Sequence, residues 1–162
     1  MRIAIISDTH FHKNPDKIQS YIEKYFKDVD MIIHAGDYTN PKTVDILKSY
    51  KQFIGVWGNV DKDSTKEMLR ETEILKINGY KIGIFHGHGK NKTTIERAYD
   101  KFKNEKVDII VFGHSHSPTI LTKGKVLMLN PGSLCYKRTE RWHSFIIIEL
   151  EKDGIKAYLK LF

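Results

Sequence analysis

The sequence repeats one arrangement five times: a short apolar run that ends directly in an aspartate, asparagine or histidine. Such runs, rich in β-branched residues, are typical of buried strands. In α/β folds, ligand-binding side chains gather beyond the carboxyl ends of the strands. The pattern therefore predicts five strands that deliver polar side chains to one site. The five junctions are Arg2–Ile6 before Ser7-Asp8-Thr9-His10, Met31–Ile33 before His34-Ala35-Gly36-Asp37, Phe53–Trp57 before Gly58-Asn59-Val60-Asp61, Ile82–Phe85 before His86-Gly87-His88, and Asp108–Phe112 before Gly113-His114-Ser115-His116.

The last junction, Gly113-His114-Ser115-His116, suggests metal binding. On an extended chain two residues that are two positions apart point to the same side, whereas on a helix they point to nearly opposite sides. Gly113 allows the chain to turn sharply as it leaves the strand. Because neutral imidazole binds zinc, manganese, iron and nickel, a same-side pair would supply half of a metal site.

The spacing of apolar residues between these junctions predicts helices in the first half of the chain and hairpins in the second. The first half is expected to be β-α-β-α-β with parallel strands, and the second mostly antiparallel. Two mixed sheets packed together with helices outside would accommodate both halves. The predicted helix starts are Asn14-Pro15, Asn40-Pro41, Ser64–Glu67 and Thr93–Glu96, and the predicted hairpin turns are Asn78-Gly79, Lys123-Gly124 and Asp153-Gly154.

Length and composition limit the class of protein. The 162 residues suit one domain that spans residues 1–162. Cys135 is the only cysteine, which excludes an intrachain disulfide. We therefore do not expect a metal site built from thiolate ligands. No apolar run reaches the roughly 20 residues of a membrane span, and none resembles a signal peptide, so we expect a cytoplasmic protein without membrane association. The net charge of +7 favours anionic partners, but the lysines are scattered, and nucleic acid is not the favoured partner.

The five motifs together resemble one family. Asp8-x-His10, Gly36-Asp37, Gly58-Asn59-x-Asp61, His86-Gly87-His88 and Gly113-His114-x-His116 occur in this order. This series resembles the calcineurin-like metallophosphoesterases, and within them the small prokaryotic phosphodiesterase branch, to which the retromer subunit Vps29 is also similar. The resemblance extends to Asn130-Pro131-Gly132-Ser133. It implies a four-layer α/β/β/α sandwich of two mixed β-sheets flanked by helices.

The resemblance also implies a dinuclear metal centre. One ion would bind Asp8, His10 and His116, the second would bind Asn59, His86 and His114, and Asp37 would bridge them. Two neighbouring dications repel each other, and a shared carboxylate offsets that repulsion. Nitrogen and oxygen ligands without sulfur suit Mn²⁺, which we expect first, with Zn²⁺, Fe²⁺, Co²⁺ and Ni²⁺ as alternatives. A hydroxide between the metals would attack the phosphodiester, with Asp37, Asn59 and His86 as the catalytic residues.

Several neighbours of these ligands carry weaker expectations. Asp61 is expected to order its loop or orient a histidine rather than to bind metal. His34 and His88 are expected either to support ligands or to have structural roles, and His12 is expected to be exposed. Val60 occupies the position where many active relatives have a histidine that protonates the leaving group, so slow turnover or substrates with good leaving groups are expected. Candidate phosphate contacts are Lys90, Lys92, Lys137, Arg138 and Arg141.

The predicted function is that of a metal-dependent phosphodiesterase acting on a small phosphodiester, with nucleotide-derived diesters among the candidate substrates. One alternative is a catalytically weak Vps29-like protein-interaction scaffold, and another is a nuclease. The complete set of seven ligand residues favours the enzyme, because a pure scaffold does not need them. A homo-oligomer is compatible with the sequence.

Overall fold

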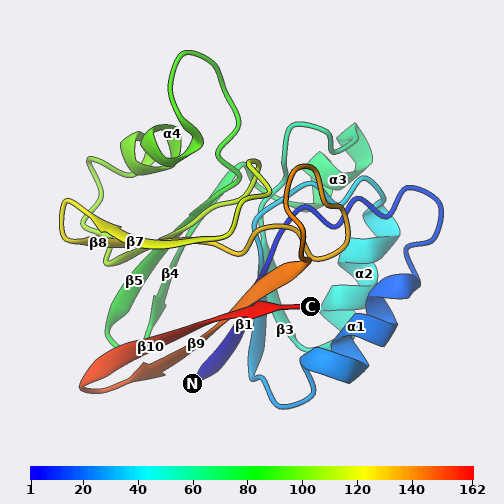
Figure 1. Cartoon of the computed structure of the whole chain (residues 1–162), viewed down its shortest axis with the longest axis horizontal. Coiled ribbons are helices and arrows are strands. Elements are labelled where there is room, and N and C mark those ends of the chain that lie inside the picture. The colour runs from blue at the N-terminus through cyan, green and yellow to red at the C-terminus, as the bar shows by residue number, and fades with distance from the viewer.

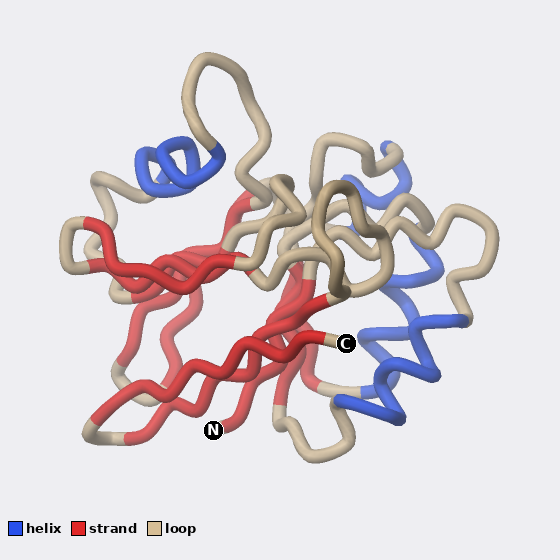
Figure 2. The backbone as a smooth tube through the Cα atoms, viewed as in Figure 1, coloured by secondary structure: helices blue, strands red, loops and turns tan.

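Two five-stranded sheets packed face to face form the centre of the protein in a computed structural model that describes residues 1–162 (Figures 1 and 2). The first sheet has the order β10-β9-β1-β2-β3 and the second β4-β5-β6-β8-β7. The strands of the first sheet are β1 (Arg2–Ile6), β2 (Met31–His34), β3 (Gln52–Gly55), β9 (Ser144–Glu151) and β10 (Gly154–Leu161). The strands of the second sheet are β4 (Thr72–Ile77), β5 (Tyr80–Phe85), β6 (Ile109–Val111), β7 (Thr119–Lys123) and β8 (Val126–Asn130). The helices are α1 (Lys17–Tyr25), α2 (Pro41–Tyr50), α3 (Asp63–Met68) and α4 (Thr94–Lys101).

Both sheets are mixed, as predicted. In the first sheet β1, β2 and β3 are parallel, and β9 and β10 are antiparallel to their neighbours. In the second sheet the central strands β5, β6 and β8 are parallel, and the edge strands β4 and β7 are antiparallel. The second half of the chain therefore contains the three predicted hairpins, but its central pairings are parallel. Two of the predicted turns are wrong by one residue: the turns are Gly124-Lys125 and Lys152-Asp153, because Lys123 pairs with Val126 and Glu151 pairs with Gly154.

Three apolar layers hold the four structural layers together. In β1, Ile3 and Ile5 face the second sheet, whereas Ala4 and Ile6 face α1 and α2, because successive side chains of a strand alternate between faces. A third cluster lies between the second sheet and α4, with Phe102 at its centre. Each fully buried isoleucine contributes roughly 1.5–3 kcal/mol relative to an exposed one. This arrangement confirms the predicted α/β/β/α sandwich.

Two of the predicted helix starts are confirmed. The Asn40 side chain accepts a hydrogen bond from the Lys42 N–H at 3.0 Å, and Pro41 is the first residue of α2. Thr93 and Glu96 form a complete capping box at the start of α4. The turn Asn78-Gly79 joins β4 to β5 with φ of 50° and 87°, the positive values that a type I′ turn requires.

The other two predicted helix starts are wrong. Asn14 does not cap α1, because Lys17 N–H donates to the Asn14 carbonyl and forms a separate turn before the helix begins at Lys17. Ser64 does not cap α3, which already begins at Asp63, with Lys62 at the cap position.

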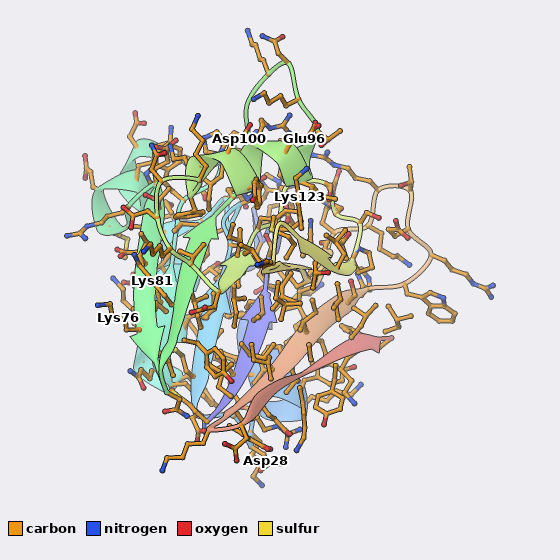
Figure 3. All side chains as sticks on the ribbon, turned by 90° about the vertical axis from the view of Figure 1, so that its left-hand side faces the viewer. Asp28, Lys76, Lys81, Glu96, Asp100 and Lys123 are labelled. Carbon is orange, nitrogen blue, oxygen red and sulfur yellow. The ribbon has the colours of Figure 1, made fainter.

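Charged side chains of both signs lie on the outside of the second sheet. Glu96 and Asp100 of α4 lie close to Lys123, and Lys76 and Lys81 project from the neighbouring strands (Figure 3). Lys81 forms an ion pair with Glu105 at 2.7 Å. The basic excess of the chain is therefore not concentrated on this face. None of the four helices is long and apolar enough to cross a membrane.

Candidate metal centre

The loops that follow β1, β2, β5 and β6 lie together beyond the carboxyl ends of these strands, where Figure 2 shows them in tan. Hydrogen bonds between their backbones join them. Asp8 N–H donates to the Gly36 carbonyl at 3.0 Å, and Gly113 N–H donates to the His86 carbonyl at 3.0 Å. The two sheets thus bring their ligand-bearing loops to one place, as the strand–ligand junctions predict.

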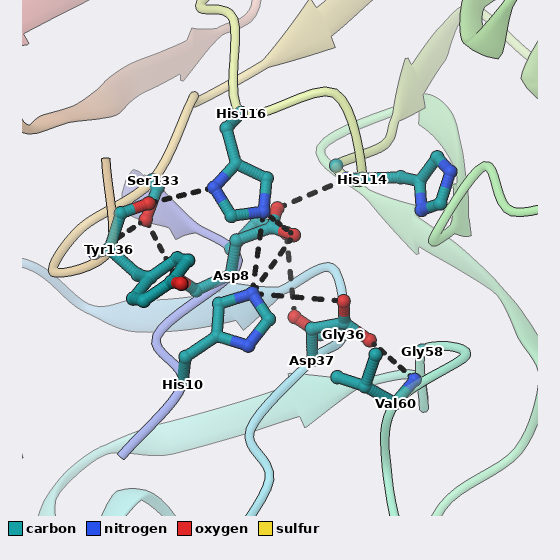
Figure 4. A network of polar contacts seen from close by, with 12 residues as sticks. Asp8, His10, Gly36, Asp37, Gly58, Val60, His114, His116, Ser133 and Tyr136 are labelled. Atoms are coloured by element: carbon teal, nitrogen blue, oxygen red, sulfur yellow. Dashed lines mark hydrogen bonds and ion pairs between the residues drawn. The ribbon is translucent and has the colours of Figure 1, made fainter. Parts of the chain in front are cut away.

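One group of side chains consists of Asp8, His10 and His116 (Figure 4). His116 Nε2 lies 3.1 Å from Asp8 Oδ1, and His10 Nε2 lies 3.8 Å from the same oxygen. The two histidine Nε2 atoms are 3.3 Å apart. Three potential ligand atoms from β1 and β6 loops therefore converge within the reach of one ion.

A second group consists of Asp8, Asp37 and His86, and all three are buried. His86 Nε2 lies 3.2 Å from Asp37 Oδ2. His10 Nε2 lies 3.8 Å from that oxygen too, so His10 is next to both groups. Because the groups share Asp8 and lie side by side, the arrangement offers two adjacent positions for cations.

Backbone carbonyls fix the orientation of two of these histidines. His116 Nδ1 donates to the Tyr136 carbonyl at 2.7 Å, and His86 Nδ1 donates to the Ala35 carbonyl at 2.6 Å. A carbonyl can only accept, so each Nδ1 carries the proton and each Nε2 is directed toward the carboxylates. Metal-binding histidines are commonly oriented by this kind of hydrogen bond.

The electrostatics of the site favour a cation. Burial raises the pKa of Asp8, but His10 and His116 outweigh burial and hold that pKa well below its usual range. Burial likewise acts to raise the pKa of Asp37, and the contact with His86 lowers it overall. Burial acts to lower the pKa of His86, but the carboxylate of Asp37 raises it overall. The carboxylates of Asp8 and Asp37 are therefore ionised, and their negative charge favours a cation between them.

Three buried atoms of the site form no hydrogen bond: Asp8 Oδ1, His86 Nε2 and His114 Nδ1. The first two only approach another potential ligand atom, His116 Nε2 at 3.1 Å and Asp37 Oδ2 at 3.2 Å respectively. Buried polar atoms are rarely left unpaired, because each costs about 1–3 kcal/mol. Divalent cations accept carboxylate oxygens and imidazole nitrogens as ligands. The donor set and its unpaired atoms therefore fit divalent metal ions.

His114, which was also predicted as a ligand, lies outside the two groups, and Asn59 is the remaining predicted ligand. The side chain of Asn59 is exposed, between Gly58 and Val60 on the loop after β3. The backbone N–H of His114 donates to Asp8 Oδ2 at 3.0 Å, while its ring projects away from Asp8 and packs edge-on against His86 (Figure 4). Burial and the neighbouring His86 lower the pKa of His114 to about 4, so its ring is neutral at neutral pH.

The extended-chain argument for the histidine pair is wrong, although both histidines are near the site. His114 and His116 have φ of 69° and 59°, in the left-handed region. Asp8, His10 and Asp37 also have positive φ, between 48° and 64°. Few residues other than glycine adopt this region, and aspartate and histidine do so more readily than most. The chain thus turns abruptly at five of the seven predicted ligands, and this turn sets the direction of each side chain.

Asp61 orders its loop, as predicted. Its Oδ1 accepts the N–H groups of Tyr38 and Thr39, both at 2.8 Å, and its Oδ2 accepts those of Asp37 at 2.9 Å and Gly58 at 2.8 Å. Burial raises the pKa of this carboxyl group, and the N–H donors oppose that rise. One buried side chain therefore joins the loop after β2 to the loop after β3.

Gly58 packs directly against Asp37. A Cβ at Gly58 would overlap Asp37 Oδ1 and would lie 2.7 Å from Asp37 N. The N–H of Val60 donates to Asp37 Oδ1 at 3.1 Å. The loop after β3 therefore positions the Asp37 carboxylate both by contact and by a hydrogen bond.

His34 and His88 have supporting contacts rather than places in the two groups. His34 Nδ1 accepts the Gly36 N–H at 3.1 Å, and burial lowers the pKa of His34 to about 3, which keeps it neutral. His88 stacks on Trp57 with ring centroids 5.2 Å apart, and its Nε2 lies 3.5 Å from Glu71. His12 is exposed, as expected.

Ser133 and the Tyr136 carbonyl are parts of the site that the sequence did not reveal. Ser133 Oγ donates to the Asp8 carbonyl at 2.7 Å and accepts the Tyr136 N–H at 2.8 Å. Asn130 Nδ2 donates to the Gly113 carbonyl at 3.0 Å. The motif Asn130–Ser133 was therefore the sequence signal that could have revealed them. Its hydrogen bonds connect the segment after β8 to the loops that contain Asp8 and His116.

The basic residues suggested as phosphate contacts are all exposed. Lys92 forms an ion pair with Asp100 at 2.6 Å. Lys137 donates to the Arg141 carbonyl at 3.2 Å, and the Arg141 guanidinium lies 5.0 Å from the Trp142 ring. Three of the five thus have partners within the chain.

Comparisons with known proteins agree with this geometry. A family model described as the calcineurin-like phosphoesterase superfamily domain matches residues 1–153. The probable metallophosphoesterase MJ0623 of Methanocaldococcus jannaschii is 35% identical over 139 residues, which cover 82% of this chain and 68% of that protein. The phosphodiesterase MJ0936 of the same organism is 29% identical over 151 residues, which cover 83% of this chain and 85% of that protein.

Among solved structures, wild-type Vps29 from Entamoeba histolytica, complexed with Zn²⁺, superposes with a TM-score of 0.76 at 24% identity and covers 99% of both chains. At 24% identity this superposition supports the assignment of the fold only. The family match over residues 1–153 and the 35% identity to MJ0623 show that the chain belongs to the calcineurin-like phosphoesterase superfamily, in the branch of small metallophosphoesterases that includes the phosphodiesterase MJ0936.

Proposed function

We propose that this protein hydrolyses small phosphodiesters with the help of two divalent metal ions. The observation that carries the proposal is the convergence of two buried carboxylates with the Nε2 atoms of three histidines in two adjoining groups. We assign Asp8, His10 and His116 to one ion, Asn59, His86 and His114 to the other, and Asp37 to both. Asp37 Oδ2 lies 3.2 Å from His86 and 3.8 Å from His10, which supports its shared assignment.

When bound, two divalent ions polarise the phosphoryl group and lower the pKa of a water molecule so that it can act as a nucleophile. The chain supplies the rigid frame. The carbonyls of Ala35 and Tyr136 keep two histidine Nε2 atoms directed inward, and the Val60 N–H holds Asp37 in place. Asn59 would add a neutral oxygen ligand, so the loaded site stays positive and attracts a phosphate.

A direct test is the hydrolysis of bis-p-nitrophenyl phosphate by chelator-treated protein to which Mn²⁺ is returned. We expect activity to depend on the added ion, and elemental analysis to find about two ions per chain. Parallel assays with Zn²⁺, Fe²⁺, Co²⁺ and Ni²⁺ identify the ion that supports the highest rate. No hydrolysis with any of the five ions would contradict the proposal.

Acidification should release the ions. Histidines bind metal only when neutral, and an ordinary histidine has a pKa of about 6.5, so occupancy should fall below about pH 6. The sign follows because protons compete with the ions at low pH, and the stabilisation that the ions give is present above this range and lost as pH falls. Elemental analysis after buffer exchange at pH 7.5 and pH 4.5 measures this loss, with circular dichroism to verify folding. Equal occupancy at both values would contradict the assignment of histidine ligands.

Replacing Val60 with histidine should change which substrates are hydrolysed well. The Val60 side chain is 42% exposed beside Asp37, so an imidazole has room there. A proton donor helps poor leaving groups most, and general-acid catalysis is typically worth about 10²–10⁴-fold. We therefore expect Val60→His to accelerate alkyl diesters more than aryl diesters, measured as kcat/KM for one of each. Val60→Leu is the control, and an equal change for the two classes would contradict the expectation.

A further inference from the structure

A groove of about 360 Å³ adjoins the metal centre. One of its walls is the segment 9–14, which follows β1 and contains His10. The start of α1 and the residues Cys135 and Tyr136 form the rest of the lining. Because His10 belongs both to the groove and to the candidate centre, a substrate whose phosphorus lies at the metals has one arm next to this groove.

Aromatic rings border the groove beside His10. The Tyr136 side chain is 50% exposed, and its ring centroid lies 4.9 Å from that of His10 (Figure 4). His12, two residues after His10, is also exposed. The ring centroids of His10 and His12 are 6.2 Å apart, and the angle between their planes is 27°. Exposed aromatic rings of this kind bind planar groups, and stacking of a base on one is worth about 1–3 kcal/mol.

Two lysines give the groove a positive charge. Lys13 and Lys17 line it, both are exposed, and neither forms an ion pair. No aspartate or glutamate lines the groove. Asp16, the carboxylate between them in the sequence, is bound by Lys42 at 3.0 Å. The two ammonium groups are therefore available to an anion.

We propose that this groove binds one arm of the phosphodiester, and that this arm is a nucleotide with a further phosphate group. The base would stack on Tyr136, and the phosphate would contact Lys13 and Lys17. The hydrolytic part of this inference rests on the function proposed above. The preferred substrate is then a dinucleotide or a short oligonucleotide with a terminal phosphate, rather than a diester in which neither substituent of the phosphate carries a charge.

The test compares the dinucleotides pApA and ApA, which differ only in the terminal phosphate. For the wild-type protein with Mn²⁺ we expect kcat/KM for pApA to exceed that for ApA by about tenfold, mainly through KM, because charge-assisted hydrogen bonds are strong. In Lys13→Ala/Lys17→Ala this ratio should fall to about one. Lys24→Ala/Lys27→Ala removes the same charge elsewhere and should keep the wild-type ratio.

The aromatic contact is tested in the same assays. Tyr136→Ala should raise KM for both dinucleotides, and Tyr136→Phe should restore it, because the phenyl ring retains the stacking surface. Metal content is measured for each variant, since the Tyr136 carbonyl also orients His116. A variant that lost its ions would be excluded from the comparison of KM, and its binding of ApA would be measured by calorimetry instead.

Failure of the two proposals can be distinguished. If the wild type hydrolyses bis-p-nitrophenyl phosphate but shows no preference for pApA, the groove assignment is overturned and the phosphodiesterase stands. If the preference persists in Lys13→Ala/Lys17→Ala, the lysine contacts are wrong. If no diester is hydrolysed, calorimetric titration of metal-free protein with pApA still decides: binding that the two lysine substitutions weaken by about tenfold supports the groove, and equal binding rejects it.

Discussion

Asp37→Asn should lower kcat/KM for bis-p-nitrophenyl phosphate by about 10³-fold, which corresponds to about 4 kcal/mol of transition-state stabilisation. The carboxylate is buried and touches both His10 and His86, so its charge acts on both proposed ion positions. Asparagine has nearly the same shape, and its carbonyl oxygen can still accept the Val60 N–H. The loss would therefore come from the missing charge rather than from a collapsed loop.

Thermal unfolding with and without Mn²⁺ separates metal binding from folding. An ion that binds only the folded protein raises Tm, and we expect this rise in the wild type but not in Asp37→Asn. Asp45→Asn, at an exposed position on α2, removes the same charge and should behave like the wild type in both assays. An unchanged Mn²⁺-dependent rise of Tm in Asp37→Asn would show that Asp37 is not a ligand.

Gly58→Ala should reduce activity by about 100-fold, as supporting residues of metal sites commonly do when changed. The new methyl group would overlap the Asp37 carboxylate and would lie 2.7 Å from the Asp37 backbone nitrogen. Overpacking of this kind costs about 1–3 kcal/mol, so the free energy of unfolding should fall as well. Activity, Mn²⁺ affinity and denaturant unfolding measure the three effects.

Gly154→Ala is the matched control for this substitution. It makes the same chemical change where a Cβ meets nothing within 4 Å and φ is not in the left-handed region. Its activity and ion affinity should stay within about twofold of the wild type, since surface substitutions usually change stability by less than about 0.5 kcal/mol. Similar losses in the two variants would show that the contact between Gly58 and Asp37 does not position the carboxylate.

The strand ends were the predictable part of the site. Asp8, Asp37 and His86 each follow a buried apolar run, and a sheet brings the carboxyl ends of its parallel strands to one edge. The alternation of Ile3 and Ile5 with Ala4 and Ile6 likewise contains the information for a strand covered on both faces. The apolar pattern, and the order of the strands and helices along the chain, were therefore enough to predict the four layers and to predict that these loops lie together.

The directions of the side chains were not predictable in the same way. His114 and His116 have the spacing of a same-side pair, but left-handed backbone at both residues turns one ring toward His86 and the other toward Asp8. The acceptors that orient His86 and His116 are backbone carbonyls, which every residue has, so no residue type marks them. Such features depend on dihedral angles and on contacts between distant segments.

The position of β1 has a consequence for folding during synthesis on the ribosome. This strand is synthesised long before β9, which is one of its two neighbours, and the Met1 amino group donates to the Leu150 carbonyl across a separation of 149 residues. Until β9 emerges, one edge of β1 has no partner, and unpaired strand edges promote aggregation of nascent chains. Ser133, whose hydroxyl group donates to the Asp8 carbonyl, also lies 125 residues after it in the sequence. Synthesis must therefore have passed β9 before Asp8 acquires its final surroundings, and ions would bind only after that point.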